Sequence, residues 1–157
     1  MINNARMLRT FLELVQIKAE SGREEAVAQH LSPRLHRLGL SVKKNGEDSS
    51  GNVIATLSPT PGRSGWIAIA AHMDTVPLEN PVKPVLRDGA IYSSGNTILG
   101  ADDRVGIASI LEALETVIEK RLPHPGIEVI FTVSEEEGLV GAKRLTSEDL
   151  QASMAFI

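Results

Sequence analysis

Cysteine is absent from the 157-residue sequence, aromatic residues are scarce, and acidic and basic residues nearly balance. Without cysteine the chain has no disulfides, no thiolate zinc finger, no iron–sulfur cluster and no cysteine nucleophile, so a metal must be held by His, Asp or Glu. Sixteen basic and twenty acidic residues give a net charge of −4, whereas proteins that bind nucleic acid or anionic membranes need a basic excess. We therefore expect neither of those partners.

Long hydrophobic runs are missing as well. Charged residues at positions 6, 9, 13, 18 and 20 interrupt the first part of the chain, which leaves no segment for a signal peptide or a membrane span. We therefore expect a cytoplasmic protein. Hydrophobic residues make up 42% of the chain and aromatic residues only 3%, so the composition predicts a folded domain whose core consists of aliphatic side chains.

Helical and strand-like patterns alternate along the chain. Amphipathic helices are predicted over residues 6–18, 23–38 and 104–120. Strands are predicted at 40–43, 52–57, 66–71, 82–86, 90–92 and 127–133, with a further helix end and strand within 150–157. This alternation predicts an α/β fold, with helices packed on a mostly parallel central sheet. The chain ends at residue 157 within a predicted strand, and we expect the fold to be truncated at its C-terminal end.

Local signals mark the ends of these elements. Ser21 and Glu24 form the pattern of a capping box before the second helix. Gly39 is placed to end that helix in the left-handed conformation, and Pro33 predicts a kink or a break inside it. An Asp-Gly pair at 88–89 predicts the turn of a small hairpin.

Three clusters of polar residues adjoin the predicted core elements. His72 and Asp74 follow the strand 66–71, two aspartates at 102–103 precede the long helix, and three glutamates at 135–137 follow the strand 127–133. Each cluster alone has an ordinary explanation: a hydrogen-bonded histidine, an N-cap aspartate, or an acidic loop. Together they supply His, Asp and Glu at the edge of an α/β sheet where ligands collect. This set suits a two-zinc hydrolytic site, since calcium or magnesium would use oxygen ligands without His.

Three longer motifs carry a family resemblance. The runs at 71–77 (AHMDTVP), 97–106 (TILGADDRVG) and 135–142 (EEEGLVGA) closely resemble the M20 zinc exopeptidases. Within that family the Leu-Gly-Ala-Asp-Asp run at 99–103 is similar to the peptidase T-like branch of tripeptide aminopeptidases. The resemblance extends over nearly the whole chain and includes Ser50-Gly51-Asn52.

The resemblance implies a role for each matching residue. Two Zn²⁺ ions are expected in a complete site, with Co²⁺ or Mn²⁺ as substitutes. The implied metal ligands are His72, Asp102 as the bridge between both ions, and Glu136. The implied catalytic residues are Asp74, which orients His72, and Glu135, the general base that takes a proton from water and passes it to the leaving amine. The resemblance also implies a cis peptide bond between Asp102 and Asp103, and leaves Glu137 without a role.

The family's architecture implies further expectations. Residues 1–157 would be the N-terminal part of a three-layer zinc-exopeptidase-like catalytic domain, with helices on both sides of the sheet. Two more metal ligands and a lid domain, through which the parent would form a homodimer, would lie outside these residues. The expected activity is hydrolysis of peptide bonds in short peptides, and the chain alone is expected to bind zinc poorly and to be an inactive fragment.

Two other functions stay open at this point. One is an amidase or deacylase of the same family that acts on N-acyl amino acids, and the other is a non-catalytic module with the fold of the catalytic domain. A nucleotide-binding loop at Gly138-x-x-Gly141 is a poor competitor, because no Lys-Ser/Thr follows it. The histidines at 30, 36 and 124 have no metal-ligand spacing and are given no role.

Overall fold

The protein is represented by a computed structural model that describes residues 1–45 and 51–157. Ser50, part of one of the motifs above, lies outside the described residues. The helices are α1 (Asn4–Leu14), α2 (Glu25–Arg37), α3 (Ala101–Glu119) and the short α4 (Val140–Lys143). The strands are β1 (Ser41–Asn45), β2 (Asn52–Leu57), β3 (Trp66–His72), β4 (Pro84–Arg87), β5 (Ala90–Ser93), β6 (Gly126–Thr132) and β7 (Ala155–Phe156). None of the helices in these two ranges is both long enough and apolar enough to cross a membrane.

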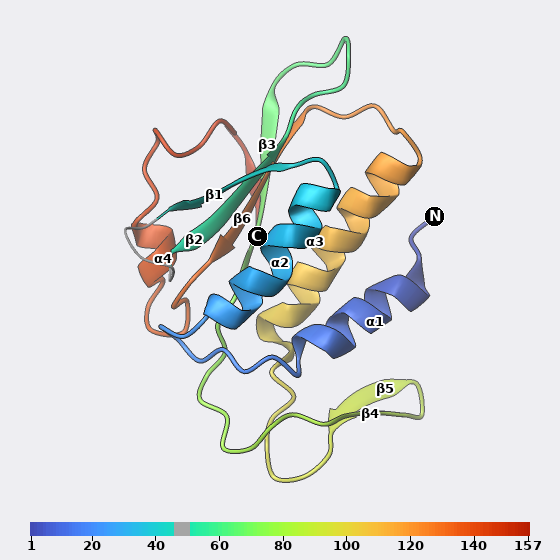
Figure 1. Cartoon of the computed structure of the whole chain (residues 1–157), viewed down its shortest axis with the longest axis vertical. Coiled ribbons are helices and arrows are strands. Elements are labelled where there is room, and N and C mark those ends of the chain that lie inside the picture. The colour runs from blue at the N-terminus through green and yellow to red at the C-terminus, as the bar shows by residue number, and fades with distance from the viewer. Residues whose placement is uncertain (46–50) are drawn as a thin grey trace.

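The central sheet has five strands in the order β1-β2-β6-β3-β7 (Figure 1). Strand β3 runs parallel to both β6 and β7, whereas β1, β2 and β6 pair antiparallel. The predicted α/β class is therefore confirmed, and the sheet is mixed, with its parallel part around β3. Because β3 and β6 are parallel neighbours, the segments that follow them leave the sheet at the same edge.

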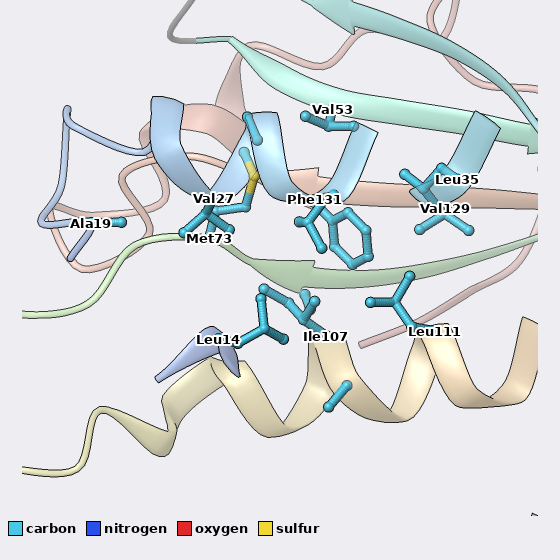
Figure 2. Close-up of a cluster of buried hydrophobic side chains, with 14 of the residues drawn as sticks. Leu14, Ala19, Val27, Leu35, Val53, Met73, Ile107, Leu111, Val129 and Phe131 are labelled. Atoms are coloured by element: carbon cyan, nitrogen blue, oxygen red, sulfur yellow. The ribbon is translucent and has the colours of Figure 1, made fainter. Parts of the chain in front are cut away.

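The long helices lie together on one face of this sheet (Figure 1). The main core fills the space between them, and Figure 2 shows aliphatic side chains of the helices packed against Val53, Val129 and Phe131 of the sheet. On the other face Ile54, Ala68 and Ile130 are covered by a smaller cluster from the segment after α4. The second face therefore has a thin cover instead of a layer of long helices.

Strands β3 and β6 differ in burial although they are neighbours. Every residue of β6 is buried, while β3 is buried on both faces only toward its end, at Ala71 and His72. The nearly continuous apolar run at 66–71 would suit a strand buried on both faces, but the first half of β3 is only partly buried. The buried end is the one that leads into the polar cluster.

Several local predictions are confirmed. Gly39 ends α2 with a φ of +85°, and Asp88 and Gly89 both have positive φ in the turn between β4 and β5. The first helix, however, ends at Leu14 instead of residue 18. Helix α2 continues through Pro33, so the break that this proline could cause does not occur.

The predicted capping box is wrong, and its two side chains have other partners. Glu24 is the N-cap residue of α2 but makes no side-chain cap bond. The Ser21 hydroxyl donates instead to Asp74 (2.7 Å), and the Glu24 carboxylate accepts from the amide of Ser134 (2.9 Å). Neither side chain therefore caps α2, and both form hydrogen bonds with residues at the polar edge of the sheet.

Candidate metal centre

The end of β3 points two polar side chains to the same side. Successive residues of an extended chain alternate in direction, and Met73 is fully buried in the helix-side core shown in Figure 2. His72 and Asp74 therefore face the opposite way, with His72 Nδ1 3.3 Å from Asp74 Oδ1 and 3.0 Å from the Asp74 carbonyl oxygen. With Nδ1 held by Asp74, the other ring nitrogen, Nε2, faces outward.

Asp74 is completely buried and saturated with hydrogen-bond donors. Besides the Ser21 hydroxyl, its carboxylate accepts from the backbone amides of Glu135 (3.0 Å) and Glu136 (3.1 Å). Burial by itself would raise the pKa of Asp74, but the contact with His72 and these three donors outweigh it and hold that pKa well below its usual range. Asp74 is therefore a fixed negative charge behind His72.

The two aspartates at the start of α3 have different surroundings. The Asp103 carboxylate accepts a hydrogen bond from the amide of Gly106 (3.0 Å), as a helix-capping residue does. Burial raises the pKa of Asp103. Asp102 is 87% exposed, and its Oδ1 lies 3.1 Å from His72 Nε2. The peptide bond between them is cis, as the resemblance implied. The ordinary capping explanation thus applies to Asp103 and leaves Asp102 free for another role.

The loop after β6 completes the cluster. Donor atoms of His72, Asp102 and Glu136 all lie within 4.8 Å of one another, close enough for one shared cation. Glu135 Oε2 lies 3.9 Å from His72 Nε2, at the rim of the same cluster. Glu137 is exposed and is not one of the three clustered donors. The structure thus brings the five predicted site residues together, while their roles stay a prediction.

The surrounding charges favour a cation at this place. Burial lowers the pKa of His72, but contacts with Asp74 and Asp102 and the nearby charge of Glu135 raise it, with a net value of about 9. The raised pKa of His72 therefore shows that the neighbouring carboxylates stabilise a positive charge at this place. A divalent cation would occupy the same field.

Two glycines explain the spacing after the glutamates. Gly138 has a φ of +90°, a backbone conformation that residues other than glycine rarely adopt. A Cβ at Gly141 would collide with the Asn52 side chain and the backbone of Val133. Asn52 is fully buried, accepts the amide of Val133 (3.1 Å) and donates to the carbonyl of Gly141 (2.8 Å). Asn52 therefore ties the two ends of this loop together.

Sequence reasoning missed two buried charged residues behind the cluster. Glu24 was assigned to a helix cap, and nothing in the sequence marked Arg104. Arg104 is 1% exposed and donates to the carbonyls of Met73 and, at 3.4 Å, Ile17. Burial lowers the pKa of Arg104 to about 10, while the charges of Asp74 and Glu24 act in the opposite direction. The guanidinium is thus a buried counter-charge to these carboxylates.

Comparison with known proteins gives one family match. The model of the family described as Peptidase family M28 matches residues 52–157, which include all three clusters. Among curated proteins, the chain is 40% identical over 161 residues to the uncharacterized protein YqjE of Bacillus subtilis, covering 99% of this chain and 43% of that one.

Two solved structures are similar to this chain over nearly its whole length. A tripeptidase from Staphylococcus aureus superposes with a TM-score of 0.92 at 42% identity, over 99% of this chain and 43% of its own. The aminopeptidase PepT from Bacillus cereus gives a TM-score of 0.93 at 42% identity, over 98% and 43%. The chain therefore spans less than half the length of these relatives.

Proposed function

This chain belongs to peptidase family M28, and on that premise we propose that it carries part of the metal centre of an exopeptidase that hydrolyses short peptides. The observation that carries the proposal is the convergence of His72, Asp102 and Glu136 from three separate segments, with donor atoms within 4.8 Å. The two structural relatives are a tripeptidase and an aminopeptidase, which supports the choice of peptide substrates.

The donor set fits zinc. One imidazole and two carboxylates are typical zinc ligands, whereas magnesium and calcium sites are built from oxygen atoms. If zinc is bound, His72 would be a ligand of one ion, Glu136 a ligand of the other, and the exposed Asp102 carboxylate a ligand of both. Co²⁺ and Mn²⁺ are the substitutes we expect. Asp74 orients the imidazole from behind, as carboxylates commonly do for metal-bound histidines.

Glu135 is the general base of this proposal. Bound zinc would acidify a water molecule, lowering its pKa from about 15.7 toward about 7, and polarise the scissile carbonyl. The Glu135 carboxylate, beside the cluster and partly exposed, would take a proton from the attacking water. As the water oxygen bonds to the carbonyl carbon and the C–N bond breaks, Glu135 would return that proton to the leaving amine.

The resemblance to the M20 exopeptidases is a separate part of the proposal, because the family model that matches this chain is that of M28. The motif at residues 99–103 is similar to the peptidase T-like branch of M20 exopeptidases, and the names of both structural relatives, a tripeptidase and the aminopeptidase PepT, support that branch. Because these relatives are more than twice as long as the aligned part, we propose that further zinc ligands come from a segment outside residues 1–157. The three-ligand set alone would then bind zinc weakly and turn over no substrate.

Metal removal and readdition test this proposal. The intact protein, meaning residues 1–157 joined to the proposed segment with the further zinc ligands, is treated with a chelator and assayed on a tripeptide with a free α-amine and on an N-acylated amino acid. We expect hydrolysis of the tripeptide to disappear on chelation and return with zinc. Activity that persists without metal would contradict the metal mechanism, and restored activity on the N-acyl substrate alone would show a deacylase instead.

A further inference from the structure

Three successive amides after β6 are held by two buried carboxylates. The amide of Ser134 donates to Glu24 Oε1 (2.9 Å). The amides of Glu135 and Glu136 donate to the two oxygens of Asp74 (3.0 and 3.1 Å). Asp74 and Glu24 come from segments 50 residues apart in the sequence, so the loop is fixed from two independent directions.

The hydrogen bonds of Glu24 lead to this loop, while Arg104 balances its charge. Glu24 is 1% exposed, makes no cap bond to its own helix, and its Oε1 accepts from Gly22 N (2.9 Å) and the Ser134 hydroxyl (3.2 Å) as well. Its second oxygen is buried, and no partner for it occurs among the described residues. Burying a carboxylate in this way is costly. Among the described residues, the hydrogen bonds that Glu24 accepts from outside its own turn both come from Ser134.

The backbone of this loop decides where its acidic side chains point. Ser134 has a φ of +50°, so the chain turns sharply as it leaves the sheet. Glu135 and Glu136 then extend toward solvent, and no arginine or lysine of the described residues forms a recorded ion pair with either. Their direction is therefore set mainly through the three bound amides.

We propose that Glu24 is a positioning residue of the metal centre, which fixes Ser134 and thereby aims Glu135 and Glu136 at His72 and Asp102. The inference rests on the proposed function for its catalytic consequence, but the bracing itself is a property of the fold. Glu24 acts through the loop backbone and touches neither metal nor substrate.

Glu128 offers a matched control. It is also fully buried, and its Oε2 also accepts two backbone amides, those of Gln151 (3.0 Å) and Ala152 (3.2 Å). Among the described residues its other oxygen likewise has no hydrogen-bond partner, and both amides that it accepts lie outside the loop at 134–136. Glu24→Ala and Glu128→Ala should therefore cost comparable stability while differing in their effect on the metal centre.

Two substitutions at position 24 separate reach from charge. Glu24→Gln keeps an oxygen at the same reach and removes the charge, whereas Glu24→Asp keeps the charge and shortens the side chain. Positioning predicts that the Gln variant stays within about threefold of the natural protein and that the Asp variant behaves like Glu24→Ala. The opposite order would overturn the proposal, and this pair decides the question even if the Ala variant does not fold.

The readouts are amide exchange, zinc affinity and kinetics of the intact protein. In Glu24→Ala we expect exchange at the amides of residues 134–136 to rise about tenfold or more, and zinc affinity to fall by roughly 10-fold to 100-fold. At saturating zinc, kcat should fall more than KM changes. Glu128→Ala should leave all of these near the natural values. Equal effects of the two Ala variants would overturn the proposal.

The same experiment distinguishes failure of the inference from failure of the proposed function. If the natural protein hydrolyses no peptide while Glu24→Ala still loosens the loop and weakens zinc binding, the positioning role stands and the peptidase assignment fails. If the natural protein is a zinc-dependent peptidase but Glu24→Ala leaves loop exchange and zinc affinity unchanged, the assignment stands and the positioning role is wrong.

Discussion

Two groups of carboxylates in this molecule differ in how their charge is balanced. On α3, Glu112 and Glu115 meet the guanidinium of Arg6 at 2.6 and 2.7 Å, and Arg34 also pairs with Glu115 at 2.6 Å. At the edge of the sheet, Asp102 and Glu135 both lie within ion-pair distance of His72, and within residues 1–45 and 51–157 no arginine or lysine pairs with either.

This difference separates a structural network from a candidate binding site. Carboxylates matched by arginines are neutralised within the protein, and their effect is on the stability of the α1–α3 contact. Carboxylates that converge without such partners repel one another and leave room for a cation. The comparison therefore predicts that substitutions in the first group change folding and that substitutions in the second change metal binding and turnover.

The largest effect is expected for Glu135→Gln. Loss of the general base should lower kcat by roughly 10²-fold to 10⁴-fold, because general acid–base catalysis contributes about that much. Zinc content should stay unchanged, since the base is not among the three clustered donors. Steady-state kinetics with metal analysis measures both quantities. Glu137→Gln, at the exposed neighbouring glutamate, is the matched control and should keep near-natural turnover; equal losses in both variants would contradict the assignment.

Asp102→Asn should weaken zinc binding next most strongly. The change keeps the size of the side chain but removes the charge assigned to the bridging position, and we expect at least a roughly 100-fold loss of affinity, since residues that merely support ligands cost about 10-fold to 100-fold. Competition with a chromophoric chelator measures the affinity. Asp88→Asn, on the exposed hairpin turn, serves as a charge control. Normal zinc binding by Asp102→Asn would contradict the assignment of Asp102 as a zinc ligand.

Glu112→Gln should affect stability instead of metal binding. The hydrogen bond from Arg6 outweighs the opposing effect of burial and lowers the pKa of Glu112 from 4.5 to about 2. This stabilisation is fully present above pH 4.5 and is lost as pH falls through about 2. Because solvent screens part of the network, we expect a loss of about 1–2 kcal/mol at neutral pH.

Denaturant unfolding of the Glu112 variant at several pH values tests that expectation. The difference from the natural protein should shrink as the pH falls from 4.5 toward 2, while zinc affinity at neutral pH is unchanged. If Glu112→Gln weakened zinc binding as much as Asp102→Asn, the distinction between the two groups of carboxylates would be wrong.

The smallest effect is expected for Ser21→Ala. The variant removes one donor from Asp74 and leaves the two amide donors of residues 135 and 136 in place. Ser21 would act on zinc only indirectly, through Asp74 and His72, and the two amide donors stay in place. We therefore expect zinc affinity to fall only several-fold, less than the roughly 10-fold to 100-fold typical of a residue that supports a ligand directly. Titration of the variant measures this, with Ser109→Ala on the exposed side of α3 as control. No change at all would show that Asp74 does not depend on Ser21.

Much of this fold follows from sequence patterns. The apolar runs predicted β2 with its observed bounds and β3 to within one residue, and the Asp-Gly pair predicted the hairpin between β4 and β5. These elements are local, because alternation and turn chemistry act over a few residues. The antiparallel pairing of β2 with β6 joins segments far apart in the chain, and the prediction of a mostly parallel sheet did not separate it from the parallel part around β3.

The candidate site was predictable where the chemistry itself was visible. His72, Asp102 and Glu136 were chosen by residue type and motif, and the structure brings the same three together. Glu24 was missed because its Ser-x-x-Glu pattern is also that of a helix cap, and only the tertiary fold places Ser134 within its reach. Buried supporting residues of this kind carry no local signal that distinguishes them.

The central claim is tested most directly by a zinc-edge anomalous diffraction map of the intact protein crystallised with zinc. The account predicts one strong peak within coordination distance of His72 Nε2 and Asp102, and a second within coordination distance of Asp102 and Glu136. A well-ordered map with no peak at these side chains, or with zinc bound only elsewhere on the molecule, would contradict it.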